Sequence, residues 1–401
     1  MKISPSIVFA AVAIAGISVA GCSDAISPDA PTHDEPSAML KTAAASARIP
    51  GSYIVVLKDN VADPSRVANE MRQLNGLGDG FTYTHAVKGF STTIPAGRLD
   101  EILRDPRVAY VEEDQIMRAT AQTLPWGVSA TGADSSSALS GDGTGSVTNV
   151  RIYIIDTGIQ TNHPDLNVVG GINYTTSNRN KYLDENGHGT HCAGIAAARD
   201  NSSYVVGMCP GAPLYSVRVL NRSGSGTTSG VIAGVDWVRG QKNANPTVPM
   251  VANMSLGGGV STLLDQAVAN CISAGVVVCV AAGNSGVDAA NSSPAREASA
   301  ITVGAHASNQ TLASWSNYGS VVDILAPGVS ILSTYKGTTT ATISGTSMAA
   351  PHVAGAAALY LSANTTASPA TVSSALVGSA QGWITHSRAS TTNLTLRVTG
   401  Y

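Results

Sequence analysis

One serine of the chain occupies a place where its hydroxyl could act as a nucleophile. Ser347 lies in the stretch 345–352, GTSMAAPH, which runs into an apolar segment over 353–361. That segment predicts a buried helix, so we expect Ser347 near a helix N-terminus. Free backbone N–H groups and the positive end of the helix dipole gather there and can stabilise an oxyanion. A serine that only caps the helix is the alternative.

An aspartate follows an apolar run. Residues 152–155 are β-branched or aromatic and lead into Asp156, Thr157 and Gly158. This pattern predicts a buried parallel strand with a carboxylate at its C-terminal end, where open α/β sheets place their sites. An aspartate that only forms a turn is the alternative.

A histidine flanked by glycines opens a second apolar segment. His188 stands in the stretch 186–194, NGHGTHCAG, at the predicted start of a helix. An imidazole there could act as a general base near neutral pH. Two alternatives remain open. His188 could be a buried structural histidine, or it could bind zinc with His191 and Cys192, at positions i, i+3 and i+4.

Together, Asp156, His188 and Ser347 resemble the subtilase family of serine proteases, whose three catalytic signatures appear here in the same order. The resemblance covers 121–401 and is closest to the proteinase K branch. It implies that Ser347 attacks the scissile carbonyl, that His188 moves the proton, and that Asp156 orients the imidazole. It also implies that His191 and Cys192 are structural, with Cys192 a buried thiol beside the catalytic histidine, which disfavours zinc.

An asparagine follows another strand pattern. Residues 276–281 are apolar and lead through Ala282 and Gly283 to Asn284. An amide N–H can stabilise an oxyanion that forms only in the transition state, and the resemblance implies this role for Asn284. An asparagine that only forms a turn is the alternative.

Two glycine-rich strand ends predict a place for an extended peptide, because glycines let a backbone approach closely. The resemblance implies that two edges sandwich the substrate and that a pocket between them takes one side chain. The residues concerned are Gly224, Ser225 and Gly226 on one edge, and Ser255, Leu256, Gly257, Ala281, Ala282 and Gly283 around the pocket. These pocket residues are small or uncharged, so we expect a broad preference for apolar or aromatic side chains. Plain glycine-rich loops are the alternative for outer positions such as Gly226.

Composition narrows the function classes. The chain has 401 residues and a formal net charge of −3, with 12% charged residues and 41 glycines. There is no basic excess to indicate nucleic-acid binding. Low charge and many small residues fit a secreted, densely packed enzyme. Separately, we expect a monomer whose substrates are polypeptides.

The N-terminal segment predicts export. An apolar run over 7–19 is too short to span a membrane comfortably, and it leads to Val19-Ala20-Gly21-Cys22, which resembles a bacterial lipobox. We expect a signal peptide over 1–21, a lipid on Cys22 and placement in the cell envelope. An ordinary signal peptide is the alternative. Residues 22–50, rich in Ala, Ser and Pro, predict a flexible linker.

Residues 51–120 predict a small ferredoxin-like domain of α+β type, with the order βαββαβ. It resembles the subtilase propeptide, which implies a folding assistant that also inhibits the enzyme within its own chain. A cut near Thr120 would mature the zymogen and separate residues 121–401 from the lipid.

The catalytic region, 121–401, alternates strand and helix patterns. This predicts an α/β fold with a doubly wound parallel sheet and helices on both faces. Cys192, Cys271 and Cys279 lie in apolar stretches that suit buried thiols, so we expect few or no disulfides, with Cys209 left open.

A calcium site is implied only by the resemblance to the subtilase family. It implies a structural site formed by the carboxylate of Asp323 and the carbonyls of Ala298 and Ala300, which are hard oxygen ligands. A solvated aspartate after a strand is the alternative. The preferred function is a serine endopeptidase made as a zymogen; a zinc hydrolase and a lipid-anchored binding protein on an inactive protease fold are the competing ones.

Overall fold

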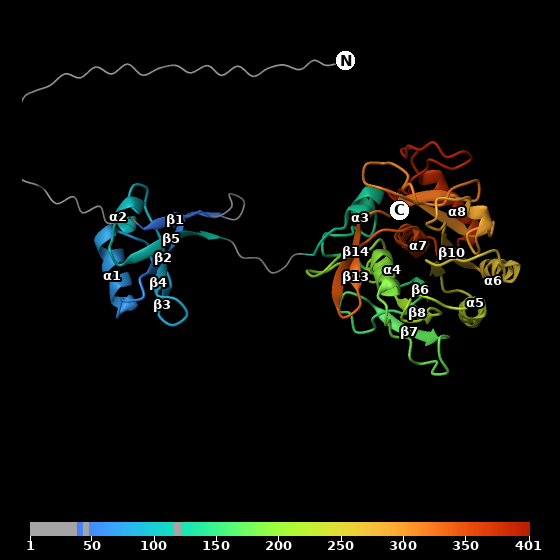
Figure 1. Ribbon diagram of the computed structural model, residues 1–401, viewed down its shortest axis with the longest axis horizontal. Helices are drawn as coiled ribbons and strands as arrows, with labels where there is room; N and C mark the ends of the chain where they lie inside the picture. Colours follow the sequence, from blue (N-terminus) through green and yellow to red (C-terminus); the bar gives the residue numbers. More distant parts are fainter. Residues whose placement is uncertain (1–37, 43–47, 116–121) are drawn as a thin grey trace, which may run out of the picture. The chain divides into compact units, whose positions relative to one another are not determined.

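The computed structural model describes residues 38–42, 48–115 and 122–401. The chain forms two compact units, Met1–Met117 and Arg118–Tyr401, and Figure 1 shows each of them as ribbons. The signal peptide, Cys22 and the expected cut near Thr120 lie outside the described residues.

The first unit is a five-stranded sheet covered by two helices. Its strand order is β1-β5-β2-β4-β3, and β2 runs antiparallel to both β4 and β5. Asp63 caps the first helix by accepting from the backbone N–H of Arg66, as its position before Pro64 predicts. The elements are β1 (Met39–Lys41), β2 (Arg48–Leu57), α1 (Pro64–Asn75), β3 (Thr82–Tyr83), β4 (Gly89–Thr93), α2 (Leu99–Leu103) and β5 (Val108–Gln115). From β2 onward, this order confirms the expected βαββαβ pattern.

Part of the expected linker over 22–50 is ordered, and that expectation was wrong there. Residues 39–41 form β1, which pairs parallel with β5, so that Leu40 lies opposite Val111. Leu40 packs against the core of this unit, and the ammonium group of Lys41 lies 3.4 Å from the centre of the Tyr110 ring. The strand forms because it covers the open edge of β5. So short a segment has no periodic pattern in the sequence that would predict it.

The second unit is built on a seven-stranded parallel sheet, ordered β12-β11-β10-β9-β6-β8-β7. The doubly wound α/β fold expected from the alternating pattern is confirmed. The strands are β6 (Arg151–Asp156), β7 (Val168–Asn173), β8 (Leu214–Arg218), β9 (Met250–Met254), β10 (Val276–Ala281), β11 (Ile301–His306) and β12 (Ile324–Pro327). Around them lie α3 (Trp126–Thr131), α4 (His188–Ala197), α5 (Thr228–Ala244), α6 (Thr262–Ser273), the hairpin β13 (Ile331–Tyr335) and β14 (Thr339–Ile343), α7 (Thr346–Ala363) and α8 (Pro369–Ser379).

Both faces of this sheet are buried. Ile152 and Ile154 of β6 join the core formed with α4 and α7, whereas Tyr153 and Ile155 join the core formed with α5 and α6. A strand buried on both faces reads as a continuous apolar run, which is the pattern of 152–155.

Helices α4 and α7 lie against each other because small residues face the contact. A Cβ atom on Gly355 of α7 would lie 2.5 Å from Cβ of Met208 and 2.7 Å from the carbonyl oxygen of Ala196. Only glycine allows so close an approach. Since His188 and Ser347 lie in the first turns of these two helices, this contact brings the two residues into one region of the molecule.

Within the described residues, none of the helices combines the length and the apolar character needed to cross a lipid bilayer. The cysteines of the second unit, Cys192, Cys209, Cys271 and Cys279, are buried free thiols.

Leu40→Asp tests whether β1 is part of the first unit. Leu40 is half-buried against the core, so the substitution should lower the free energy of unfolding of this unit by about 1–2 kcal/mol. Urea unfolding of the full chain carrying Ser347→Ala would measure it. Met39→Asp is the control, because Met39 is 69% exposed on the same strand. Equal stability of the two variants would show that β1 contributes nothing.

Candidate active site

Asp156 lies at the C-terminal end of β6, which lies between β8 and β9 in the sheet. The chain passes from β6 to β7 and β8 on one side of this strand, and then from β9 to β12 on the other. Such a topological switch point is where open α/β sheets form their sites. The carboxylate is fully buried, and its Oδ1 accepts a hydrogen bond from the backbone N–H of Thr157 at 2.7 Å. A buried carboxylate needs further donors.

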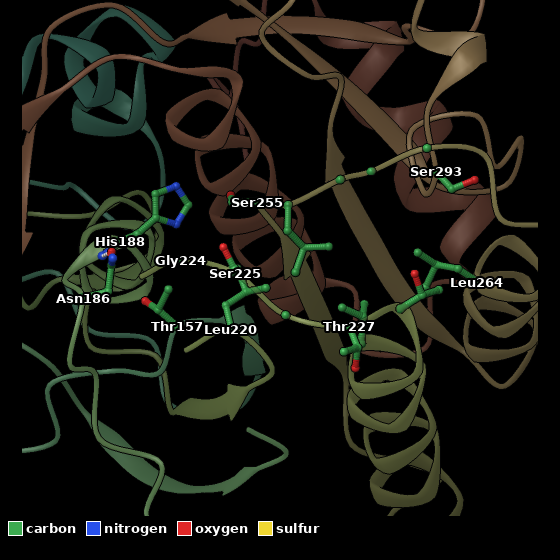
Figure 2. A pocket seen from close by; sticks show the side chains of 17 residues that line it. Thr157, Asn186, His188, Leu220, Gly224, Ser225, Thr227, Ser255, Leu264 and Ser293 are labelled. Atoms are coloured by element: carbon green, nitrogen blue, oxygen red, sulfur yellow. Dashed lines mark hydrogen bonds between the residues drawn. The ribbon is translucent and has the colours of Figure 1, made fainter. Parts of the chain in front are cut away.

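His188 supplies that donor from the first residue of α4. Its Nδ1 lies 2.8 Å from Oδ1 and 3.0 Å from Oδ2 of Asp156. The ring is 28% exposed, and Figure 2 shows it beside a groove. Because the carboxylate accepts a hydrogen bond from the N–H of Nδ1, Nε2 is left as the nitrogen that can accept a proton.

Opposing effects set the pKa of His188. Burial lowers this pKa, whereas the negative charge of Asp156 and its hydrogen bond raise it, with a further rise from Asp184. The net direction is upward from the ordinary value of 6.5. The site therefore favours the imidazolium, the form that a general base reaches after it has taken a proton.

Ser347 is the second residue of α7. Its hydroxyl donates to the carbonyl oxygen of Ser255 at 3.2 Å, and its own carbonyl accepts from Oγ of Ser255 at 2.8 Å and from Sγ of Cys192 at 3.3 Å. Among the described residues, no hydrogen bond joins the Ser347 hydroxyl to His188. Contacts of this kind are often long in active sites without substrate, and a bond to the imidazole would require the Ser347 side chain to rotate away from Ser255.

Asn284 has its amide carbonyl fixed. Its Oδ1 accepts from the backbone N–H of Thr346 at 2.8 Å and from the Thr346 hydroxyl at 2.9 Å. This leaves the NH₂ group available as a donor, and Asn284, which is exposed, lines the same cavity as Ser347. The preceding Gly283 has φ of +105°, and a Cβ atom there would lie 2.4 Å from Nδ2 of Asn317, so glycine is required.

Two adjoining cavities flank these groups. The first, about 430 Å³, is lined by His188, by 224–226 and by Ser255. The second, about 450 Å³, is lined by 281–284 and by Ser347. They share the wall formed by 256–259, and neither has an Asp, Glu, Lys or Arg in its lining.

Every residue expected to bind substrate therefore lines one of the two cavities. The sequence did not point to Thr227, Val231 and Leu264, which line the first cavity from the starts of α5 and α6. Figure 2 labels Thr227 and Leu264 at this cavity. These residues belong to helix starts, and only the arrangement of the helices around the sheet turns them towards the groove.

The zinc alternative does not fit the geometry. Nε2 of His191 lies 3.1 Å from the carbonyl of Ile331 and 3.0 Å from that of Ala341, so it points away from His188. Ligand atoms of Asp156, His188 and Cys192 do lie within 4.8 Å of one another. However, burial and the charge of Asp156 raise the pKa of Cys192 well above its ordinary value, which keeps the thiol protonated.

The expected calcium ligand Asp323 lies where a cation could be held. Its Oδ2 accepts from the backbone N–H of Thr302 at 2.8 Å, and burial raises the pKa of its carboxyl. Thr302 follows Ala300 by two residues, so the carboxylate lies by the segment that carries the expected carbonyls. A half-buried carboxylate with one hydrogen bond is a candidate ligand for a hard cation.

A second oxygen-rich cluster surrounds Asp165, which sequence reasoning missed. Asp165 is fully buried, and burial raises its pKa to about 6 although Nδ2 of Asn201 and the N–H of Val205 donate to it. Nε2 of Gln122 donates to the carbonyl oxygens of Arg199 and Val205 at 2.6 and 2.8 Å. Carboxylate, amide and carbonyl oxygens are calcium ligands. No local sequence pattern indicates this cluster, because its residues come from three distant segments.

Comparison with known proteins agrees with this geometry. A model of the subtilase family matches residues 148–401, and a model of peptidase inhibitor I9 matches residues 52–120. The extracellular serine proteinase of Thermus sp. (strain Rt41A) is 43% identical over 362 residues, which cover 83% of this chain and 85% of that protein. Subtilisin E of Bacillus subtilis (strain 168) is 43% identical over 338 residues, covering 82% of this chain and 85% of that protein.

A solved structure is similar as well. The crystal structure of a cold adapted subtilisin-like serine proteinase matches with a TM-score of 0.58 and 45% identity, covering 63% of this chain and 89% of that one. The chain therefore belongs to the subtilase family, and it is a serine endopeptidase preceded by an inhibitor-type propeptide domain.

Proposed function

We propose that Asp156, His188 and Ser347 form the catalytic triad and that Asn284 stabilises the oxyanion. The observation that carries this proposal is the contact of His188 Nδ1 with the buried Asp156 carboxylate at 2.8 Å, which leaves Nε2 free for a proton. The placement of Ser347 in the first turn of α7 supports it.

The steps follow from these positions. The Ser347 oxygen bonds to the peptide carbonyl carbon while its proton passes to Nε2 of His188. The resulting imidazolium is stabilised by Asp156 and gives the proton to the leaving amine as the C–N bond breaks. Water then releases the acyl group by the reverse sequence, with His188 again as the base.

Ser347→Ala tests the triad. The full chain should lose peptidase activity by several orders of magnitude and should remain uncut near Thr120, because the nucleophile is absent. Gel analysis of the expressed chain and a peptide-hydrolysis assay would measure both effects. Ser362→Ala, farther along α7, is the matched control and should mature normally.

A serine-directed phosphonate should abolish wild-type activity; inhibition by a zinc chelator alone would instead revive the metallohydrolase alternative.

Asn284→Ala tests the oxyanion role. It should lower kcat by about 10²–10³, the magnitude known from a subtilisin, and leave KM nearly unchanged, because the oxyanion exists only in the transition state. Steady-state kinetics of the mature enzyme would measure this. Asn270→Ala on the exposed side of α6 is the control. A kcat equal to that of the control would remove Asn284 from the mechanism.

We further propose that residues 51–120 act as folding assistant and inhibitor of the same chain until a cut near Thr120 releases the protease. The match of 52–120 to peptidase inhibitor I9 supports this. The extracellular relative supports secretion. The lipid on Cys22 stays a prediction, because Cys22 lies outside the described residues.

The two cavities support a preference for apolar or aromatic substrate side chains, since no Asp, Glu, Lys or Arg lines them. Glycines 257–259 form their common wall and leave room for a peptide backbone. We also infer the proteinase K-like branch, supported by the buried thiol of Cys192 one turn after His188.

We propose that calcium stabilises the second unit through Asp323, with the carbonyls of Ala298 and Ala300, and through the cluster around Asp165. A bound cation would neutralise carboxylates that burial leaves poorly compensated.

Thermal unfolding of the full chain carrying Ser347→Ala tests the calcium sites. A chelator should lower Tm, because a site with calcium at 100 times its Kd stabilises by about 2.7 kcal/mol. Asp165→Asn and Asp323→Asn should each reduce the difference in Tm between calcium and chelator. Asp236→Asn, on the exposed side of α5, should preserve it. Equal Tm values in calcium and chelator would refute both sites.

A further inference from the structure

The first turn of α4 is held by side chains from outside the helix. Its preceding residue, Gly187, has no side chain to cap it. The first N–H groups of a helix need partners. Here they donate to three different side chains: His188 N–H to Oδ1 of Asn186 at 3.1 Å, Gly189 N–H to Oγ1 of Thr157 at 2.9 Å, and Thr190 N–H to Oδ2 of Asp184 at 3.0 Å.

Asp184 is the centre of this arrangement. Its side chain is buried, at 3% exposure, and accepts five hydrogen bonds. Oδ1 accepts from the Thr157 hydroxyl at 2.9 Å and from the N–H groups of Asn186 and Gly187 at 2.8 Å each. Oδ2 accepts from the N–H and hydroxyl of Thr190 at 3.0 and 2.6 Å. The positive end of the helix dipole also stabilises a negative charge at this place.

Thr157 connects this carboxylate to the end of β6. Its hydroxyl donates to Asp184 and accepts from Gly189 N–H, while its own N–H donates to Asp156 at 2.7 Å. Asp184 thus fixes both the turn that carries Asp156 and the helical turn that carries His188. The separation of those two side chains depends on the same carboxylate.

Asp184 also contributes to the charge around the imidazole. Asp156 and Asp184 are the two charged groups that raise the pKa of His188. On the ring's own helix, His191 is neutral near pH 7, because burial lowers its pKa to about 4, and burial keeps the thiol of Cys192 protonated.

The charged side chains of the loop and hairpin next to His188 contact other partners. Glu185 pairs with Arg218 at 2.7 Å and with Lys181 at 3.1 Å. The ammonium group of Lys336, at the end of the β13 side of the hairpin, lies 3.3 Å from the Glu185 carbonyl. Tyr335 of that hairpin faces Gly187, where a Cβ atom would lie 2.3 Å from its ring. Asp184 is therefore the group outside the triad whose charge acts most directly on His188.

We propose that Asp184 is a positioning residue of the catalytic apparatus, which locks the Asp156–Thr157 turn to the first turn of α4 and so holds His188 in register with its carboxylate. The role rests on the proposed function of His188 as the general base. Asp184 contacts no reacting atom; it acts through Thr157, Thr190 and the backbone between them.

Asp184→Asn in the full chain is the test. An amide in place of the carboxylate turns one acceptor into a donor that faces N–H groups, and it removes the charge. In the matured enzyme, kcat should fall by about 10–100-fold with KM changed less than about threefold. The acid limb of kcat/KM, which in the wild type should lie above pH 6.5, should move to lower pH because the His188 pKa falls.

Asp200→Asn is the matched control. Asp200 lies beyond the other end of α4 and also accepts three backbone N–H bonds, from Gly141, Gly143 and Gly145. The acid limb of kcat/KM for the Asp200→Asn variant should equal that of the wild type. Asp184→Asn with wild-type kcat and an unmoved acid limb would overturn the proposal, as would a loss of kcat that Asp200→Asn reproduces.

A pair of variants at Thr157 keeps the test open if Asp184→Asn does not fold. Thr157→Val removes the hydroxyl that joins Asp184 to Gly189, while Thr157→Ser retains it. The kcat of the valine variant should fall and that of the serine variant should stay near the wild type. Equal kcat values for the two would overturn the proposal. Failure of the triad itself would show differently, as wild-type activity that resists the serine-directed phosphonate.

Discussion

The contact between the buried carboxylate of Asp156 and Nδ1 of His188 is the interaction on which the catalytic unit depends. A carboxylate with no exposed surface is costly unless donors surround it, and here the Thr157 N–H and the imidazole are those donors. The same contact fixes which ring nitrogen carries the proton. The sheet provides one partner and α4 the other, so a small shift of the helix against the sheet would break the pair.

Small residues make that precision possible. Helix α7 is buried along nearly its whole length and is rich in alanine, and Gly355 allows it to approach Ala196 of α4 closely. Short side chains leave few rotamers and little room for adjustment, so the backbones themselves determine the spacing. The high glycine content of the chain, 41 residues, is in part the consequence of such contacts. A pair of helices held this closely carries His188 and Ser347 on rigid supports.

Sequence alone predicted the features whose signal is local. Asp156, His188, Asn284 and Ser347 each stand in a short motif that includes both the chemical group and the turn or helix start around it. The parallel sheet followed from apolar runs such as 152–155. By contrast, β1 depends on pairing with β5, and its three residues have no pattern of their own. The donors to Asp165 come from a distant segment, and the link from Asp184 to β6 depends on the hydroxyl of Thr157, which a single aspartate in a sequence does not reveal.

The Ser347 hydroxyl can change its hydrogen-bond partner while the main chain around it stays fixed. Its main chain is held at the carbonyl by Oγ of Ser255 and Sγ of Cys192, so a change of partner is confined to its side chain. Moving the hydroxyl from the Ser255 carbonyl to Nε2 of His188 exchanges one hydrogen bond for another. The net worth of such a bond is about 1 kcal/mol, which is small beside the barrier to peptide hydrolysis. In the proposed mechanism, the Ser347 hydroxyl can therefore rest away from His188 without a large loss of rate, provided that the imidazole itself does not move.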